Sequence, residues 1–215
     1  MDFMDTGKRS RAYDARGRQA QAQRNRDAIL DAARAGFLSH GYAATTMASI
    51  ADAAGLSVDT VHKAFGGKAG LVRAIYERSL SGDGPIAAPR RSDDMQSAEP
   101  DPYTIVRGWG TLSTEVAPLV APIHLLIRDA AATDPEMAAL LHDSDRQRRE
   151  RMRDNARTLA DRGYLKSDVT LEDATDVMWT YSSPELYELL VVRCGWDLIR
   201  YGRFIGDSLA AALLR

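Results

Sequence analysis

The chain has 215 residues, of which 45% are hydrophobic and 27% are charged, and its formal net charge is −2 at pH 7. These values are typical of a globular protein with one large or two small domains. We expect no membrane contact, because the apolar stretches are far shorter than the roughly 20 residues of a membrane span, and no signal peptide, because the N-terminus is polar and basic. The single cysteine, Cys194, excludes a disulfide framework and favours a cytoplasmic location.

The charge is unevenly divided along the chain. Residues 1–80 carry 12 Lys/Arg and 8 Asp/Glu, whereas residues 81–215 carry 16 Lys/Arg and 22 Asp/Glu. This asymmetry favours an N-terminal part that faces a polyanion, joined to an acidic remainder, although exposed charge more often only solvates a surface.

Residues 1–23 are predicted to be a flexible basic arm ahead of the first helix. Such an arm can lie along a DNA backbone or in a minor groove, and a solvated terminus without contacts fits the composition equally well. The basic residues of this region and of the start of the first helix are Lys8, Arg9, Arg11, Arg16, Arg18, Arg24 and Arg26.

Residues 24–80 are predicted to be a compact run of helices, because all eight prolines lie at or after Pro85. The first helix carries apolar residues at four-residue spacing and can end at Gly41, which is free to take a left-handed cap. Thr46 and Ser57 can cap two further short helices, and Gly55 supplies a tight turn between them. The residues that we expect to face inward are Ile29, Ala33, Phe37, Ile50, Ala54, Val61 and Phe65.

Two short helices joined by a glycine turn form a helix-turn-helix, whose second helix can present its N-terminal residues to the major groove of DNA. The outward side chains offer donors, acceptors and methyl groups for base edges, while Thr60, His62 and Lys68 could instead bind phosphate oxygens. The predicted DNA-binding residues are Thr46, Ser57, Val58, Asp59, Thr60, His62, Lys63 and Lys68.

Residues 81–100, rich in Ser, Gly, Asp, Ala and Pro, are predicted to be a linker or mobile loop. In residues 101–215, three pairs place a capping side chain before a proline at the first helical position: Asp101-Pro102, Asp134-Pro135 and Ser183-Pro184. Strand signals are scarce, so the fold class is predicted as all-α.

A long charged helix is predicted from Pro135 to about Arg162. The middle of this helix, residues 145–154, is rich in mixed charge and is predicted to be a solvated face. Two ion pairs are expected there at helical spacing, namely Arg146–Glu150 and Asp154–Arg157.

The ordered residues of the N-terminal part are Gly41-Tyr42, Thr45-Thr46, Ile50-Ala51, Ala54-Gly55-Leu56-Ser57, Thr60, Phe65, Lys68 and Leu71. This set resembles the signature of the tetracycline-repressor-like (TetR) transcriptional regulators over residues 24–80. The tail Ser183-Pro184-Glu185-Leu186-Tyr187, with Gly195-Trp196, is similar to the C-terminal region of many members. Two positions depart from the family: His62 stands where a phosphate-binding tyrosine is usual, and Ala69 where an acidic residue is usual.

The resemblance implies nine or ten helices, arranged as an N-terminal three-helix DNA-binding domain and a C-terminal helical domain for ligand binding and dimerisation. It further implies a homodimeric repressor that binds a palindromic double-stranded DNA operator and is released by a small-molecule effector. We expect that effector to be small and largely apolar, without identifying it. The cavity lining predicted for it is Trp109, His124, Arg128, Met137, Leu141, His142 and Met178.

Apolar stripes at helical spacing in the last helices can close an intramolecular core or, with a second copy, a four-helix bundle, and the resemblance favours the bundle. The predicted dimer residues are Met178, Tyr181, Tyr201, Ile205 and Leu209.

The sequence leaves three alternatives to a ligand-responsive repressor. The first alternative is a ligand-independent dimeric DNA-binding protein. An enzyme is disfavoured, because none of the four histidines lies four residues from another and no catalytic or nucleotide-binding motif is present. No cofactor or metal is expected; a zinc ion held by His124, His142 and a carboxylate is the weakest alternative.

Overall fold

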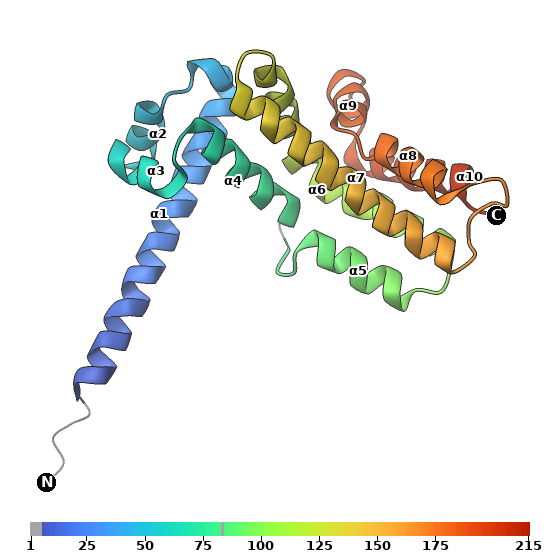
Figure 1. Cartoon of the computed structure of the whole chain (residues 1–215), viewed down its shortest axis with the longest axis horizontal. Helices are drawn as coiled ribbons and strands as arrows, with labels where there is room; N and C mark the ends of the chain where they lie inside the picture. Colours follow the sequence, from blue (N-terminus) through green and yellow to red (C-terminus); the bar gives the residue numbers. More distant parts are fainter. Residues whose placement is uncertain (1–5, 83) are drawn as a thin grey trace, which may run out of the picture. The chain divides into compact units, whose positions relative to one another are not determined.

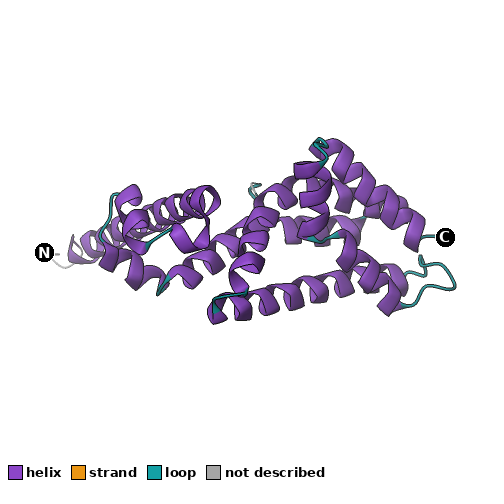
Figure 2. Ribbon diagram, turned by 90° about the horizontal axis from the view of Figure 1, so that it is seen from above, coloured by secondary structure: helices purple, strands orange, loops and turns teal. Residues whose placement is uncertain are grey.

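A computed structural model describes residues 6–82 and 84–215 of the chain, and every named element in these ranges is a helix, as the sequence predicts (Figures 1 and 2). The chain divides into two compact units, one extending to Ala74 and the other from Ile75 to Arg215. This division falls inside α4 (Lys68–Ser81), a few residues before the predicted domain boundary at residue 80.

The first unit contains α1 (Thr6–Ala44), α2 (Met47–Ala54), α3 (Val58–Phe65) and the start of α4. Residues 6–23, predicted as a flexible arm, are instead helical, and their Ala, Gln and Arg residues have high helix propensity. α1 also continues beyond Gly41 across a kink at that residue, where φ is 81°. The placement of residues 1–5, and the side chains of Lys8, Arg9, Arg11 and Arg16, lie outside the described residues.

The first unit has its own core, made by the inward faces of its helices. Of the residues predicted to face inward, all but two are buried. Ala54 is half-buried, whereas Ala51, three residues earlier, is fully buried. Phe65 is half-buried beneath the Arg26 guanidinium, which lies 4.4 Å from its ring centroid.

The second unit contains the end of α4 and seven further helical segments. α6 (Pro102–Ala131) contacts four of them, namely α5, α7, α9 and α10, and so forms the centre of the unit. The segments are α5 (Ala88–Ala98), α6, α7 (Pro135–Asp161), α8 (Leu171–Tyr181), α9 (Pro184–Tyr187), the π-helical η1 (Glu188–Arg193) and α10 (Leu198–Leu213).

The three predicted proline-associated helix starts are confirmed. The Asp101 carboxylate accepts from the amides of Tyr103 and Thr104, and the Asp134 carboxylate caps α7 in the same way. The Ser183 hydroxyl accepts from the Leu186 amide at the start of α9. Each cap satisfies backbone donors that a helix start leaves without an internal partner.

The predicted linker over residues 81–100 is wrong for its second half, which forms α5 (Figure 1). The buried positions of α5 are Ala88, Ser92 and Gln96, one residue per helical turn. Because these side chains are small or polar, the helix has no apolar stripe that would distinguish it from a loop in the sequence.

Within the described residues, α6 is the helix whose length and apolar composition would suffice to cross a membrane, with 33% of its most apolar window buried. Core helices of globular domains have the same composition, and α6 packs against four neighbours. Its crossing with α10 is close, because Gly110 and Gly202 face each other there without side chains.

The apolar stripe predicted as the dimer surface lies inside the second unit. Met178, Tyr201, Ile205 and Leu209 are buried among the core residues, and Tyr181 is half-buried against them. A side chain buried within its own chain has no surface left for a second copy, so the four buried residues are not available as an interface, whereas Tyr181 keeps part of its surface. The intramolecular alternative, which the periodicity left open, is the observed one.

Candidate nucleic-acid interface and ligand cavity

The α2–turn–α3 segment has the local geometry that the sequence predicts. The Thr46 hydroxyl accepts from the Ser49 amide at 3.0 Å, and the Ser49 hydroxyl accepts from the Thr46 amide at 3.1 Å, which forms a capping box. Gly55 has a φ of 67°, a left-handed conformation that glycine adopts without strain. The Ser57 hydroxyl then caps α3 by accepting from the Thr60 amide at 3.2 Å.

α3 has one buried face and one exposed face. Val61 is fully buried, whereas Val58, Asp59, His62 and Lys63 are exposed. The exposed set contains a cation, a carboxylate, an imidazole and an apolar group, which together can contact phosphates and base edges. The predicted recognition residues at these four positions therefore remain candidates.

Two of the predicted DNA-contacting side chains, Thr60 and His62, already form hydrogen bonds within the protein. The Thr60 hydroxyl lies 2.8 Å from the Ser57 hydroxyl. His62 Nδ1 lies 3.0 Å from the Gly66 carbonyl oxygen and must donate to it, so that Nε2 of the neutral ring is an acceptor. A neutral His62 therefore suits an amino group on a base edge better than a phosphate oxygen.

Lys68, predicted as a phosphate contact, is bound to α1. Its Nζ donates to the Tyr42 carbonyl oxygen at 2.7 Å and lies 4.3 Å from the centroid of the Tyr42 ring. These contacts fasten the start of α4 to the kinked end of α1, which gives Lys68 a structural role in the first unit.

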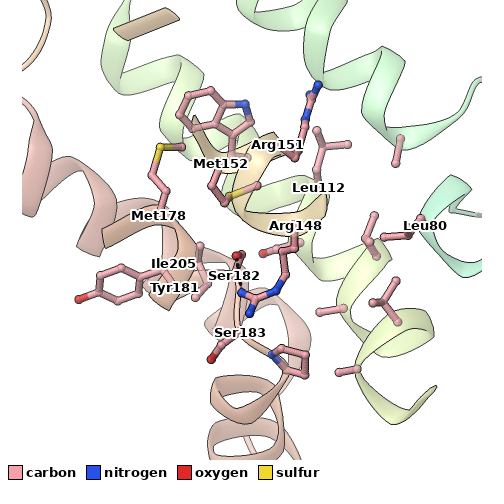
Figure 3. Close-up of a pocket in the computed structure, with 18 of the residues that line it drawn as sticks. Leu80, Leu112, Arg148, Arg151, Met152, Met178, Tyr181, Ser182, Ser183 and Ile205 are labelled. Atoms are coloured by element: carbon pink, nitrogen blue, oxygen red, sulfur yellow. Dashed lines mark hydrogen bonds between the residues drawn. The ribbon is translucent and has the colours of Figure 1, made fainter. Parts of the chain in front are cut away.

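The second unit contains a partly open cavity of about 420 Å³ between α4, α5, α6, α7, α8, α9 and α10 (Figure 3). Most of its wall is apolar, including Leu80, Leu112, Met152 and Ile205. Trp109 also lines it and donates from Nε1 to the Ser92 hydroxyl of α5 at 3.1 Å. The helix predicted as a loop therefore closes one side of this cavity.

The cavity contains two of the seven residues predicted to line it, Trp109 and Met178. It also contains the four other residues predicted for the dimer surface, because the stripe of α8 and α10 faces inward. The remaining predicted lining residues lie elsewhere in the second unit: His124 and Met137 are buried, Arg128 and Leu141 are half-buried, and His142 is exposed.

Arg128 and His124 belong to two separate polar clusters. Arg128 Nη1 lies 3.3 Å from a Glu185 carboxylate oxygen and 3.7 Å from one of Glu188. His124, 2% exposed, has its Nε2 at 3.2 Å from Asp145 Oδ1, while its Nδ1 has no hydrogen-bond partner. Its ring lies beside that of Tyr76 on α4, with the centroids 5.9 Å apart.

The burial of His124 predicts a pH dependence of stability. Burial lowers the His124 pKa below 6.5 and outweighs the opposing effect of Asp145. Below about pH 6.5 the unfolded chain therefore binds a proton that the native protein does not. We expect the free energy of unfolding to fall as the pH decreases through this value. The contribution of His124 to this loss is complete below the pKa of His124 in the native protein.

The measurement is chemical denaturation between about pH 7 and pH 5, and His124→Gln should show a shallower pH dependence than the wild type. The matched control is His142→Gln, since His142 is exposed on α7. Equal pH dependence in the wild type and His124→Gln would show that His124 does not carry this effect.

Two arginines bring polar groups to the cavity wall from α7. Arg148 Nη1 donates to the Ser182 hydroxyl at 3.0 Å (Figure 3). The same atom donates to the Trp179 carbonyl oxygen at 2.7 Å. Arg151 Nη1 lies 2.7 Å from Asp93 Oδ1. The charged middle of α7 is predicted as a solvated face. Its pairs Arg146–Glu150 and Asp154–Arg157 are present at 3.1 Å, but Arg148 and Arg151 also line the cavity.

Sequence reasoning missed Arg148 and Asn155 as cavity residues, although a signal was present. They share one helical stripe with the apolar Met152 and Leu159, at spacings of three or four residues. Polar residues on an otherwise apolar stripe indicate a polar function inside the fold. In the described part of the chain, no three His, Cys, Asp or Glu side chains are grouped as metal ligands would be.

Known proteins match this chain in its N-terminal sequence and in its whole fold. The family model for bacterial regulatory proteins of the tetR family matches residues 29–75. The HTH-type transcriptional repressor ComR of Escherichia coli (strain K12) is 43% identical over 56 residues, which are 26% of this chain and 27% of ComR. The chain thus aligns with only about a quarter of the length of this curated relative.

Two solved structures show the same fold over most of the chain. SmeT, the repressor of the Stenotrophomonas maltophilia multidrug efflux pump SmeDEF, is 23% identical with a TM-score of 0.67, covering 88% of this chain and 90% of SmeT. NalD, the secondary repressor of the Pseudomonas aeruginosa pump MexAB-OprM, is 18% identical with a TM-score of 0.70, covering 91% and 98%. Residues 29–75 thus match the sequence pattern of the tetR family of bacterial regulatory proteins, and the whole chain is similar in fold to the repressors SmeT and NalD.

Proposed function

We propose that the protein is a cytoplasmic, homodimeric transcriptional repressor that binds a palindromic operator and is released by a small, largely apolar ligand. The observation that carries the DNA-binding part is α3, whose Val61 is buried while four neighbouring side chains are exposed. In a two-fold symmetric dimer, two such helices can enter successive major grooves.

The DNA-binding part is tested with sequences selected from a random duplex pool. We expect selection of an inverted repeat, and an affinity that falls at least a hundredfold between about 50 and 200 mM salt. Such a slope needs about two phosphate-bound cations from each of two copies. A response close to zero would exclude phosphate contacts as the main source of affinity.

The cavity supports control of this binding by a ligand. Its wall includes Tyr76 and Leu80 of α4, and the same helix begins at Lys68 in the first unit. SmeT, which shares the fold, has been solved as a complex with triclosan. A ligand releases DNA only if it binds more tightly to the conformation with low DNA affinity, so effective ligands must show measurable linkage between the two binding events.

A second copy requires a surface other than the predicted one. Large apolar side chains stay exposed on η1 and α10: Leu189 at 50%, Val192 at 65% and Ile199 at 71%. We propose that this face contributes to the dimer, because exposed apolar groups of this size favour association. Sedimentation equilibrium of the wild type and of Val192→Arg measures the dimer directly.

The alternative is a ligand-independent dimeric DNA-binding protein, in which the second unit only dimerises. A second unit without internal space would favour that alternative, whereas a cavity of about 420 Å³ favours a ligand. Release of DNA by a cavity-filling molecule distinguishes the two.

A further inference from the structure

The charges at the cavity wall are compensated within the protein. Arg148 Nη2 lies 3.2 Å from Asp145 Oδ1, and Arg151 is paired with Asp93 at 2.7 Å. Burial raises the pKa of Tyr76 and of Tyr201 to about 12, so both hydroxyls are neutral at pH 7. Because a buried ion without a partner is costly, this wall favours an uncharged ligand.

Two residues of the wall each hold a buried polar atom that has no hydrogen-bond partner in the protein. These atoms are Oδ1 of Asn155, a residue that is 4% exposed, and Nε of Arg148. Both residues line the cavity from α7. An unpartnered buried polar group destabilises the native state, and a bonded ligand group would remove that cost.

The positions of these atoms define the chemistry that satisfies them. Asn155 offers both an acceptor and a donor from one amide, so a hydroxyl group pairs with it in either amide orientation. Arg148 Nε is a donor only and needs an oxygen acceptor. The two residues are seven apart on α7, which separates their Cα atoms by about 10 Å along the helix axis.

We infer that the cavity binds an uncharged, elongated apolar molecule with a hydroxyl group hydrogen-bonded to Asn155 and a second oxygen accepting from Arg148. This inference rests on the proposed ligand-binding function and adds the class of ligand. The apolar middle of the molecule would lie against Leu112, Met152 and Met178, which line the same wall and are labelled in Figure 3 with Arg148.

The test is calorimetric titration of the full chain without DNA. The probes are linear α,ω-diols of eight to twelve carbons, with the dimethyl ether and the α,ω-dicarboxylate of the best-binding length. We expect the diol to bind about tenfold or more tightly than either relative, because the ether lacks a donor and the dicarboxylate is charged. Tighter binding of the dicarboxylate, or no binding by any diol, would overturn the inference.

Variants assign the hydroxyl contact to a residue. Asn155→Leu keeps the size of the side chain without its polar atoms. We expect this variant to bind the diol and the ether with about equal affinity. Ser113→Ala is the matched control, because the Ser113 hydroxyl lines the cavity but already donates to the Gly110 carbonyl oxygen at 2.6 Å. An unchanged preference in Asn155→Leu would remove Asn155 from the site.

Two further measurements test separately the unpartnered state of Asn155 and the proposed control of DNA binding by a ligand. Asn155→Leu should unfold at a temperature equal to or above that of the wild type, since it removes an unpartnered buried polar group; a marked decrease would mean that Asn155 is bonded within the fold. A diol that binds but leaves DNA affinity unchanged would contradict the proposed control of DNA binding. The inferred class of ligand would still hold in that case.

Discussion

Lys63→Glu is expected to lower DNA affinity about a hundredfold at roughly 0.1 M salt, with no change in the free energy of unfolding. Lys63 is exposed on α3, and among the predicted DNA contacts it is the exposed cation, since Lys68 is bound to Tyr42. The substitution replaces an attraction to phosphate by a repulsion, and a two-fold symmetric dimer suffers this change twice.

The measurement is fluorescence anisotropy with the selected DNA duplex over a range of salt. We also expect a smaller salt slope for the variant, because fewer counterions are released. The control is Arg157→Glu on α7, which changes net charge equally and lies in the second unit, where Arg157 pairs with Asp154 at 3.1 Å. An equal loss in both variants would indicate a general effect of net charge and argue against α3 as the interface.

Gly110→Ala is expected to lower the free energy of unfolding by about 3 kcal/mol. A β-carbon at Gly110 would overlap the Gly202 carbonyl oxygen and lie 3.0 Å from the Gly206 amide nitrogen, so that α6 and α10 must move apart. The contact is with backbone, which cannot turn aside as a side chain can. The higher helix propensity of alanine, worth about 1 kcal/mol, offsets only part of this cost.

Gly108→Ala is the matched control, two residues earlier in the same helix. The atoms nearest to a β-carbon there belong to the Met95 side chain, which can adopt another rotamer. We expect a change within about 1 kcal/mol of the wild type, in either direction, by denaturant titration. A similar large loss in both variants would show that the glycines matter through helix flexibility and not through the α6–α10 crossing.

The first unit was largely predictable because its determinants are local. The caps at Thr46 and Ser57 and the turn at Gly55 each depend on residues within four positions, and all three are present. The exposed face of α3 follows from the helical period once Val61 is inside. The role of Lys68 was not predictable, because its partner Tyr42 lies 26 residues away.

The second unit was predictable at its helix starts and not in its packing. Asp101, Asp134 and Ser183 cap helices as predicted, since a cap involves neighbouring residues. α6 continues through Pro118 and Pro122, which would ordinarily predict a break, because its neighbours hold it in place. Periodicity marked the stripe of α8 and α10 as apolar but could not say whether its partner was another helix of the same chain or a second copy.

The amino-acid sequence alone determined the all-helical class, the helix-turn-helix and the surface that α3 presents, since these follow from hydrogen bonds and side-chain spacing over a few residues. The tertiary structure alone decided which side of the C-terminal stripes is buried, that α5 closes the cavity, and that Arg148 and Asn155 line it. A cavity is the space left when distant helices pack, so its lining depends on side-chain volumes and helix crossings that no local pattern contains.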